Sequence, residues 1–376
     1  MKKIIYLILL TIISSYSFSQ HATIDTTYYN NGKSKAKLNY HSLAIADYTK
    51  AIELNPYYVG AYNNRGVSKS QLQDYHGAIV DFTKVIELKP DDAKAYNNRG
   101  IVKDGLKDHH GAISDYTKAI ELNPNYTDAY NNRGSLKLEL KDYHGVIADY
   151  TKFIELNPDY ANAYNNRGIS KAELKDYQGA IVDFTKAIEL KPNEAIAYSY
   201  RGHSKSELKD YYGAIVDYTK AIELKPNDAL TYSYRGVSKS QLQNHHEAIK
   251  DYAKAIELNP DDTLAYFNRG YEKAELQDND GAITDYTKAI ELKPKNARAF
   301  YYRGISKAKL KDHNGAIADY TKTIELNPDF TDLAYYNRGS SKEIIGLSYC
   351  SDYKKGCELG NKLSCEALNR RKCQKK

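Results

Sequence analysis

Asparagine returns at a fixed position along this chain, in a spacing that could bind a peptide backbone. Seven asparagines, most of them 34 residues or a multiple of 34 apart, share this position: Asn30, Asn64, Asn98, Asn132, Asn166, Asn268 and Asn337. A primary amide is both a donor and an acceptor, so it can pair with the N–H and C=O groups of an extended peptide without reading its sequence. We predict a ladder of peptide contacts; the alternative is a solvated surface position.

Aromatic residues replace these amides in the C-terminal half of the chain. Tyr200 and Tyr234 stand where the asparagines stand elsewhere, and Tyr301 lies one position earlier in its own unit. Aromatic faces can hold proline, aliphatic side chains or sugar rings. We predict that these tyrosines bind a peptide or, as a second ligand class, a glycan. The alternative is that tyrosine, at 37 residues, is this chain's common filler.

Arginine and aspartate recur with the same period, which predicts repeated charge pairs. Arginine holds position 7 in nine units, as in Arg65, and aspartate holds position 23 in nine units, as in Asp81, which lies 16 residues after it. We interpret them as ion pairs within or between units, because a regular co-repeat with an acid favours internal pairing. The other interpretation is an arginine ladder that grips acidic ligands.

All four cysteines fall in the last 27 residues: Cys350, Cys357, Cys365 and Cys373. The segment reads as two short helices joined by a turn at Gly360 and Asn361. Cys357 and Cys365 are equidistant from that turn, as are Cys350 and Cys373, so we predict these two nested disulfides. A zinc site is the rival, but spacings of seven and eight residues are unlike the short paired loops of structural zinc sites.

No residue pattern in the chain predicts catalysis. Nucleotide-binding loops and nucleophile elbows are missing, and histidines at equivalent places in neighbouring units would lie too far apart to share a metal. The formal net charge of +6 is small and scattered, which argues against a nucleic-acid partner. We therefore expect no enzyme activity, no cofactor and no metal.

Two helical segments in each 34-residue unit must position these side chains. With Tyr62 counted as position 4, residues 25–330 divide into nine units in which position 8 is glycine, position 20 is small and position 24 is aromatic. This spacing predicts a helical hairpin in which Gly66 and Ala78 are the small residues opposite the ring at position 4, and the side chains at positions 24 and 28 fill the seam. Asp74 is placed to cap the second helix, and all nine prolines share position 32. Such units bury their apolar faces by stacking.

At these positions the sequence resembles the tetratricopeptide repeat family. The resemblance implies an all-α fold, a right-handed α-solenoid of helical hairpins, with the first helices lining a concave groove. Positions 2, 5, 6, 9, 12 and 13 would face that groove, and asparagine ladders in some members bind peptides. Two features depart from the family: tryptophan is absent, and position 11 is lysine (Lys69, for example) where an aromatic is common. We expect this lysine to lay its stem on the seam and keep its ammonium in water.

The two ends of the chain differ from the repeats. Residues 331–376 form a degenerate tenth repeat and a cap in which "CELGNKLSC" resembles the cysteine-rich Sel-like repeats of exported bacterial proteins. Residues 1–19, with Lys2, Lys3 and an apolar run, read as a signal peptide cleaved after Ser19. The rival interpretation is an uncleaved membrane anchor. We expect an exported protein in the periplasm, at the cell surface or secreted, without membrane insertion after cleavage.

These observations predict a non-catalytic scaffold that binds an extended peptide or a partner protein in the groove. Two alternatives remain at this level: a structural component of a cell-envelope assembly, and a glycan-binding module that uses the aromatic half. Hydrogen bonds contribute about 1 kcal/mol each, so an amide ladder alone barely offsets the cost of association. Side-chain pockets must supply the remaining affinity.

Overall fold

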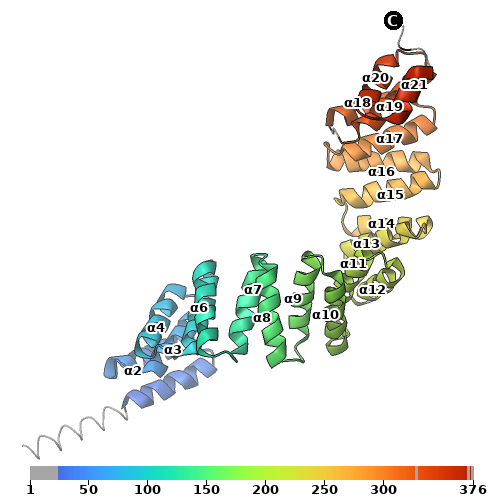
Figure 1. Cartoon of the computed structure of the whole chain (residues 1–376). Helices are drawn as coiled ribbons and strands as arrows, with labels where there is room; N and C mark the ends of the chain where they lie inside the picture. Colours follow the sequence, from blue (N-terminus) through green and yellow to red (C-terminus); the bar gives the residue numbers. More distant parts are fainter. Residues whose placement is uncertain (1–23, 327–328, 371–372, 374–376) are drawn as a thin grey trace, which may run out of the picture. The chain divides into compact units, whose positions relative to one another are not determined.

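The computed structural model describes residues 24–326, 329–370 and 373 (Figure 1). These residues form helices joined by short turns, and no strand is found among them. The chain divides into two compact units, which meet in sequence between Leu190 and Lys191. The predicted all-α helical repeat fold is confirmed. The predicted signal peptide, residues 1–19, lies outside the described residues.

Each hairpin pairs a first helix with a second helix. In the N-terminal unit the first helices are residues 24–37, α3 (Val59–Gln71), α5 (Ala93–Gly105), α7 (Thr127–Glu139) and α9 (Ala161–Glu173). The second helices there are α2 (His41–Leu54), α4 (Tyr75–Leu88), α6 (His109–Leu122), α8 (Tyr143–Leu156) and α10 (Tyr177–Leu190).

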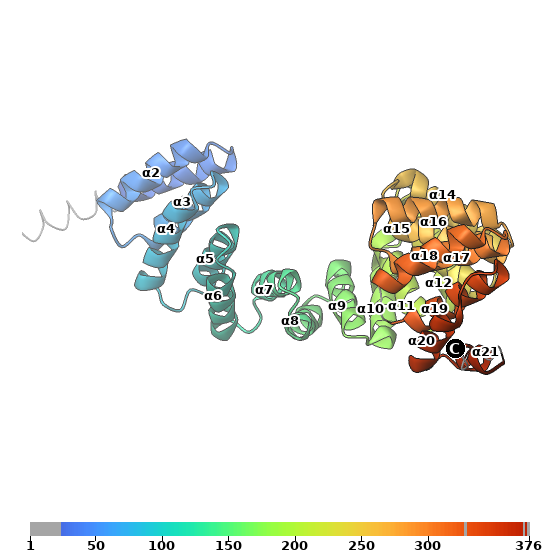
Figure 2. The same cartoon turned by 90° about the horizontal axis from the view of Figure 1, so that it is seen from above.

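The C-terminal unit repeats the plan. Its first helices are α11 (Ala195–Glu207), α13 (Ala229–Gln241), α15 (Thr263–Glu275), α17 (Ala297–Lys309) and α19 (Thr331–Ile344). Its second helices are α12 (Tyr211–Leu224), α14 (His245–Leu258), α16 (Asn279–Leu292), α18 (His313–Leu326) and α20 (Cys350–Glu358), and α21 (Lys362–Arg370) closes the chain. Figure 2 shows these helices from above. None of the described helices combines the length and apolar character that crossing a bilayer requires.

Local chemistry fixes the two ends of each turn. The Asp74 carboxylate accepts a hydrogen bond from the Gly77 N–H at 3.0 Å, which is the predicted cap of α4. Before it, the chain turns through one residue in the left-handed region, with φ at 62° for Gln73 and 64° for Lys107. That conformation ends the first helix and directs the chain back along it.

The seam of each hairpin is closed by the ring at position 24. A Cβ atom on Gly66 would lie 2.9 Å from a ring carbon of Phe82, so only glycine lets the two helices approach this closely. The prediction that the aromatic at position 24 fills the seam is confirmed, whereas the prediction that the ring at position 4 lies opposite Gly66 is wrong. Tyr62 instead lies beneath the guanidinium of Arg65, 5.5 Å from the ring centre.

The charge pairs form a buried frame within and between repeats. The Arg65 guanidinium donates twice to the Asp81 carboxylate, at 2.7 and 3.0 Å, and once to Thr49 of the preceding repeat at 3.1 Å. The Lys69 ammonium lies 2.8 Å from the same carboxylate, which is fully buried. The expectation that Lys69 keeps its ammonium in water is therefore wrong, because a buried carboxylate needs its charge compensated. Internal pairing, the predicted role of the arginines, is confirmed.

Candidate functional site on the first helices

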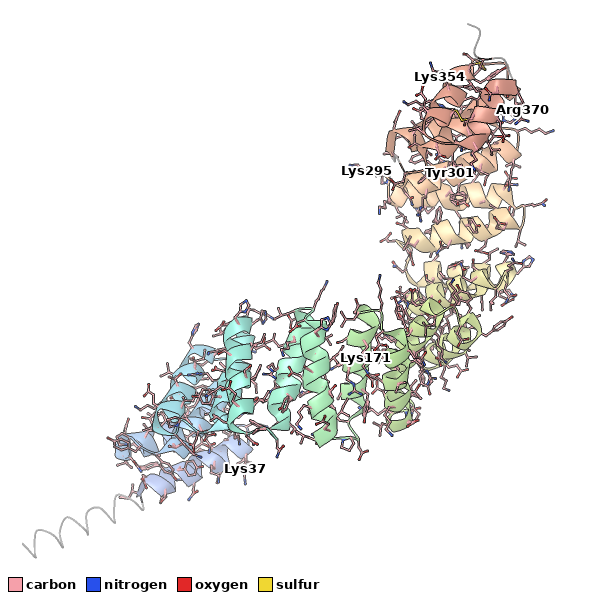
Figure 3. The ribbon with its side chains drawn as sticks, viewed as in Figure 1. Lys37, Lys171, Lys295, Tyr301, Lys354 and Arg370 are labelled. Atoms are coloured by element: carbon pink, nitrogen blue, oxygen red, sulfur yellow. A yellow bond between two sulfur atoms is a disulfide. The ribbon has the colours of Figure 1, made fainter. Side chains whose placement is uncertain are left out.

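The predicted ligand residues lie on the first helices, and most are half-buried. We use the name first-helix face for the side chains at positions 2, 5, 6, 9, 12 and 13 of these helices. Asn30 is exposed, whereas the six asparagines that follow it in the ladder are half-buried: Asn64, Asn98, Asn132, Asn166, Asn268 and Asn337. The side chains of the whole chain are drawn in Figure 3, with Tyr301 labelled on α17.

Several of these amides donate hydrogen bonds across the boundary between repeats. The Asn98 amide donates to the Asn63 amide oxygen at 3.3 Å, and the Asn132 amide donates to Asn97 at 3.0 Å. Each bond joins position 6 of one repeat to position 5 of the repeat before it. The asparagines thus link neighbouring repeats, a role that the sequence did not predict. Each amide still has further donor and acceptor capacity for a ligand.

Tyrosine hydroxyls accept this hydrogen bond where position 5 of the preceding repeat is tyrosine rather than asparagine. The Asn64 amide donates to the Tyr29 hydroxyl at 3.1 Å, and Asn337 donates to Tyr301 at 3.0 Å. Tyr301 was predicted as a ligand residue in its own right. Its hydroxyl accepts a hydrogen bond from the next repeat, so its ring is held in place.

The predicted aromatic residues form walls with their neighbours. The ring of Tyr234 stacks on Tyr218 with centroids 6.0 Å apart, and Tyr301 meets Tyr302 edge-on at 5.5 Å. Burial raises the pKa of both Tyr234 and Tyr301, with nearby tyrosines adding to the effect for each. Tyr200 is half-buried. Whether these rings contact a ligand stays a prediction, but their positions are fixed by packing.

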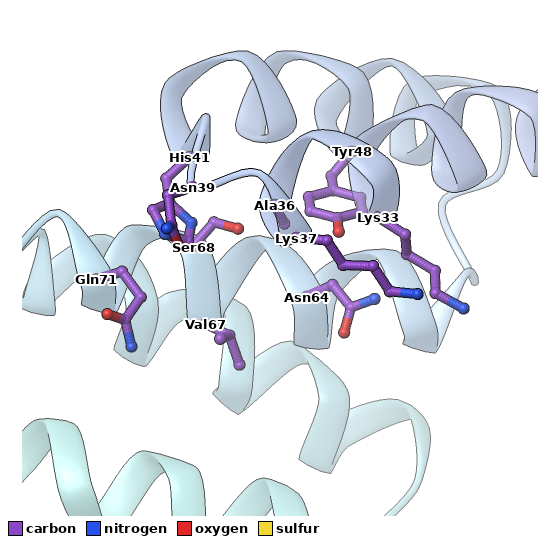
Figure 4. Close-up of a pocket in the computed structure, with 10 residues that line it drawn as sticks. All are labelled: Lys33, Ala36, Lys37, Asn39, His41, Tyr48, Asn64, Val67, Ser68 and Gln71. Carbon is purple, nitrogen blue, oxygen red and sulfur yellow. The ribbon is translucent and has the colours of Figure 1, made fainter.

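Three cavities open on the first-helix face, and each contains one of the predicted asparagines or its neighbours. The first, of about 450 Å³, is lined by Lys33, Ala36, Lys37, Asn39, His41, Tyr48, Asn64, Val67, Ser68 and Gln71 (Figure 4). In Figure 4 the side chains of Lys37, Tyr48 and Asn64 lie together at one end and Gln71 at the other. The second and third cavities, of about 320 and 290 Å³, include Asn268 and Asn337.

The residue at position 9 is common to all three cavities. Val67, Val237 and Ile305 hold this position in α3, α13 and α17, and each lines its own cavity. An aliphatic side chain beside an amide supplies both apolar contact and a hydrogen-bonding group, the usual composition of a ligand site. A fourth cavity, of about 460 Å³, lies instead at the loops, where Lys293, Lys295 and Arg298 line it.

The sequence reasoning missed Glu272. This glutamate lines the second cavity and is 1% exposed. It stands at position 10, where the other units have serine, valine or leucine: Ser34, Ser68, Val102, Leu136, Ser170, Ser204, Ser238, Ser306 and Ser341. A charged residue at an otherwise small or apolar register position was the signal that could have found it.

The cysteine-bearing segment forms the predicted disulfides. Cys350 is bonded to Cys373 and Cys357 to Cys365, with Cα atoms 5.5 and 4.6 Å apart. The pairing predicted from the turn at Gly360 is confirmed, and the thiols are not zinc ligands. Within the described residues, no group of three histidine, cysteine, aspartate or glutamate side chains could hold a metal ion. The sulfur atoms are yellow in Figure 3.

Helix α20 also completes the tenth hairpin. Asp352 pairs with Arg338 at 2.7 Å and with Lys342 at 2.8 Å, as the frame aspartates do elsewhere. The Tyr353 ring lies 3.0 Å from the place of a Cβ on Gly339. The sequence hid this role because Asp352 follows Arg338 by 14 residues rather than 16. An arginine and a lysine in register without their aspartate were the missed signal.

The fold and its repeating frame define a helical repeat protein built from two-helix units. The chain belongs to the tetratricopeptide repeat family, whose members act as protein-interaction scaffolds. Models described as tetratricopeptide repeat match residues 26–58, 59–92, 93–126, 115–147, 161–194, 195–228, 229–262 and 297–330, and one described as TPR repeat matches 270–311.

One solved structure shares this fold, and two others are similar over shorter stretches of the chain. The C-terminal part of a TPR repeat-containing protein from Cytophaga hutchinsonii aligns with a TM-score of 0.55 at 20% identity, over 64% of this chain and 98% of its own. YrrB, described as a TPR protein with an unusual peptide-binding site, is 25% identical, with a TM-score of 0.45 over 53% of this chain and 98% of its own. MamA is 27% identical, with a TM-score of 0.42 over 43% and 94%. No curated protein matches the sequence significantly.

Proposed function

We propose that this protein is a non-catalytic scaffold that binds an extended peptide segment of a partner protein on its first-helix face. The observation that carries the proposal is the repetition of one kind of cavity. Three cavities each combine a half-buried asparagine at position 6 with an aliphatic side chain at position 9, which comes from the same helix in the first cavity and from the preceding repeat in the other two. Cavities repeated on successive first helices suit an extended ligand rather than a small molecule in one pocket.

The amides would hold the backbone of the peptide and the cavities would take its side chains. The frame of arginine, lysine and aspartate keeps the first helices in register, so the face is formed before the ligand arrives. Preorganised side chains lose less conformational entropy on binding. This division of roles gives the cavities the larger share of the affinity, since amide contacts contribute little each.

We also propose that the protein is exported. Two disulfides within one short segment support this, because such bonds persist in oxidising compartments. Sequencing of the N-terminus of the protein purified from its native cells tests the proposal. A chain that starts after Ser19 supports export, and a chain that starts at Met1 contradicts it.

Charge placed at position 9 tests the binding face. The variant carries Val67→Arg, Val237→Arg and Ile305→Arg, which place a bulky cation in all three cavities. The matched control carries Val80→Arg, Val182→Arg and Val216→Arg on second helices, where these valines are 61 to 67% exposed. Both variants gain the same charge.

Peptides selected from a displayed random library by the full chain are the probe. We expect the first variant to bind them at least tenfold more weakly and the control to bind them as the parent does, with equal helicity by circular dichroism. Retained binding in the first variant, or failure of the parent to select any peptide, would overturn the proposal.

A further inference from the structure

Glu272 is a buried acid without the arginine and lysine that accompany the buried aspartates of the frame. Asp251 and Asp285, in the repeats on either side of its cavity, each lie within 2.8 Å of both an arginine and a lysine. Among the described residues, no lysine or arginine lies within 4.0 Å of Glu272. Burial of a carboxylate is unfavourable unless it is paired and hydrogen-bonded. The contrast identifies Glu272 as a group with unused capacity for a positive charge.

Two donors hold the Glu272 carboxylate in place. The Ser240 hydroxyl donates to one oxygen at 2.6 Å, and the Nδ1 atom of His245 lies 2.6 Å from the other. A neutral imidazole can donate this hydrogen bond, and it adds a full charge only when it is protonated. A carboxylate has about four acceptor positions. The two bonds therefore fix the orientation of Glu272 and leave acceptor positions for a ligand.

Aromatic rings line the cavity beside this carboxylate. Phe267 and Tyr271 both meet Tyr302 edge-on, with centroids 5.6 Å apart, and all three rings line the same space of about 320 Å³. This volume is at the small end for ligand sites, which suits one long side chain. Ring faces attract cations, and the attraction grows as water is excluded.

We propose that this cavity receives one basic side chain, lysine or arginine, of a peptide bound on the first-helix face. Glu272 supplies the counter-charge, the rings of Phe267, Tyr271 and Tyr302 contact the aliphatic stem and the cationic head, and the amides of Gln241 and Asn268 flank them. The inference rests on the proposed function and adds a specificity to it. It assigns to one repeat a preference that the other repeats, with a small or apolar residue at position 10, do not have.

The charges around the opening agree with a cationic ligand. Arg298 also lines the cavity, but it is exposed, and a charge in contact with water acts more weakly than a buried one. Glu275 lies beside Tyr271: burial, followed by the charge of Glu275, raises the pKa of that phenol. Glu275 is thus a second carboxylate beside one of the lining rings, whereas Arg298 is the one cation in the lining itself.

A pair of small probes tests the proposal on the full chain. The probes are N-acetylarginine methylamide and N-acetylcitrulline methylamide, which have nearly the same shape and differ in charge. Ligand-detected saturation-transfer NMR titrations measure their affinities, which are expected to be weak. We expect the arginine probe to bind at least about tenfold more tightly than the citrulline probe, as a Coulombic contact with a buried acid predicts.

Variants then assign the difference to Glu272. Glu272→Gln keeps the shape and removes the charge, and it should weaken the arginine probe at least about tenfold. Glu173→Gln removes an exposed acid from a first helix of the other unit and should leave binding unchanged. If Glu272→Gln fails to fold, Glu272→Ser replaces it, because serine is the residue of most other units at this position.

Equal affinity for the two probes, no binding of the arginine probe, or full binding by the Glu272 variant would overturn the proposal. None of these outcomes says whether the library peptides bind, because the position 9 variants test that binding. The proposed preference for a basic side chain can therefore be contradicted while the scaffold proposal stands. Failure of the scaffold proposal is likewise visible in the library experiment alone.

Discussion

The two compact units of the chain share one frame and differ on their first-helix faces. In the N-terminal unit, Arg99 and Asp115 lie 2.7 Å apart, and in the C-terminal unit Arg235 and Asp251 lie at the same distance. Positions 5 and 6 differ, because the N-terminal unit has successive Asn-Asn pairs, whereas the C-terminal unit has Ser-Tyr, Phe-Asn, Tyr-Tyr and Tyr-Asn. Hydrogen bonds between asparagine amides link repeats in the first unit, whereas in the second unit ring contacts, with the hydrogen bond from Asn337 to Tyr301, link them.

This difference separates the residues that make the fold from those that are free to make a binding surface. The frame residues face the seam and cannot vary without loss of packing. Positions 6 and 9 keep part of each side chain exposed, so position 6 can exchange amide for ring and still connect the repeats. Function is therefore expected to follow the face, and stability to follow the frame.

The largest expected effect comes from removal of a frame aspartate, in either unit. Asp115→Ala or Asp251→Ala leaves an arginine and a lysine without their buried partner, which typically costs about 3–5 kcal/mol. Because stacked repeats can open locally, hydrogen exchange followed by mass spectrometry is the measurement. Both variants should lose protection in their own hairpin to a similar extent. Glu121→Ala, in an exposed pair with Lys118, is the control and should change little. Unequal losses of protection in the two units would contradict the claim that both share one frame.

Loss of the disulfides should affect only the C-terminal unit, because all four cysteines lie in it. Replacement of Cys350 and Cys373 by serine opens the larger loop, in which the cysteines are 23 positions apart, and is expected to cost the cap about 3 kcal/mol. Loss of the bond between Cys357 and Cys365, which are eight positions apart, should cost about 2.5 kcal/mol. Hydrogen exchange should rise in α20 and α21 only. Equal changes in the N-terminal unit would contradict the assignment of these bonds to a local cap.

The amide ladder of the N-terminal unit should contribute less. Asn98→Ala removes the hydrogen bond to Asn63 and is expected to lower the free energy of unfolding by about 1 kcal/mol. Asn30→Ala, at an exposed position, should leave it unchanged. Urea unfolding followed by circular dichroism measures both. Identical midpoints for the two variants would mean that the ladder does not join the repeats.

Alkaline pH should lower the stability of the C-terminal unit more than that of the N-terminal unit. The effect of each tyrosine is the smallest of the predicted effects. Burial raises the pKa of Tyr218 and of Tyr252 at position 24, where the N-terminal unit has Phe82 and Phe184 among its five rings. The folded state keeps these phenol protons longer than the unfolded chain, whose phenols titrate near pH 10. Their contribution to stability is therefore complete below about pH 10 and is lost as the pH rises further.

Urea unfolding between pH 8 and pH 11 measures this dependence. Tyr218→Phe should flatten the fall in stability at high pH, whereas Tyr212→Phe, at a position 72% exposed in the same helix, should not. A parallel fall in both variants would show that burial of Tyr218 does not control the response.

Most of the frame could be predicted from the sequence, because its residues depend on contacts within one hairpin. Gly66, Asp74 and the pairing of Arg65 with Asp81 follow from periodicity and from the chemistry of each residue. The disulfides followed from distances along two short helices. The role of Asn98 could not be predicted, because its partner is set by the rotation of one repeat against the next. The prediction for Lys69 was wrong for a related reason, because its ammonium reaches an acid that is buried only when the hairpin closes.

The sequence by itself determined the repeat, its hairpin and its capped end, since a 34-residue period with glycine at position 8 and an aromatic at position 24 allows no other packing of two helices. Only the tertiary structure decided which side chains meet across repeats. It placed Asp352 of the cysteine-bearing helix in the frame, and it buried Glu272 between Ser240, His245 and a wall of aromatic rings. Those contacts depend on the stacking of separate hairpins, and no spacing along the chain encodes that stacking directly.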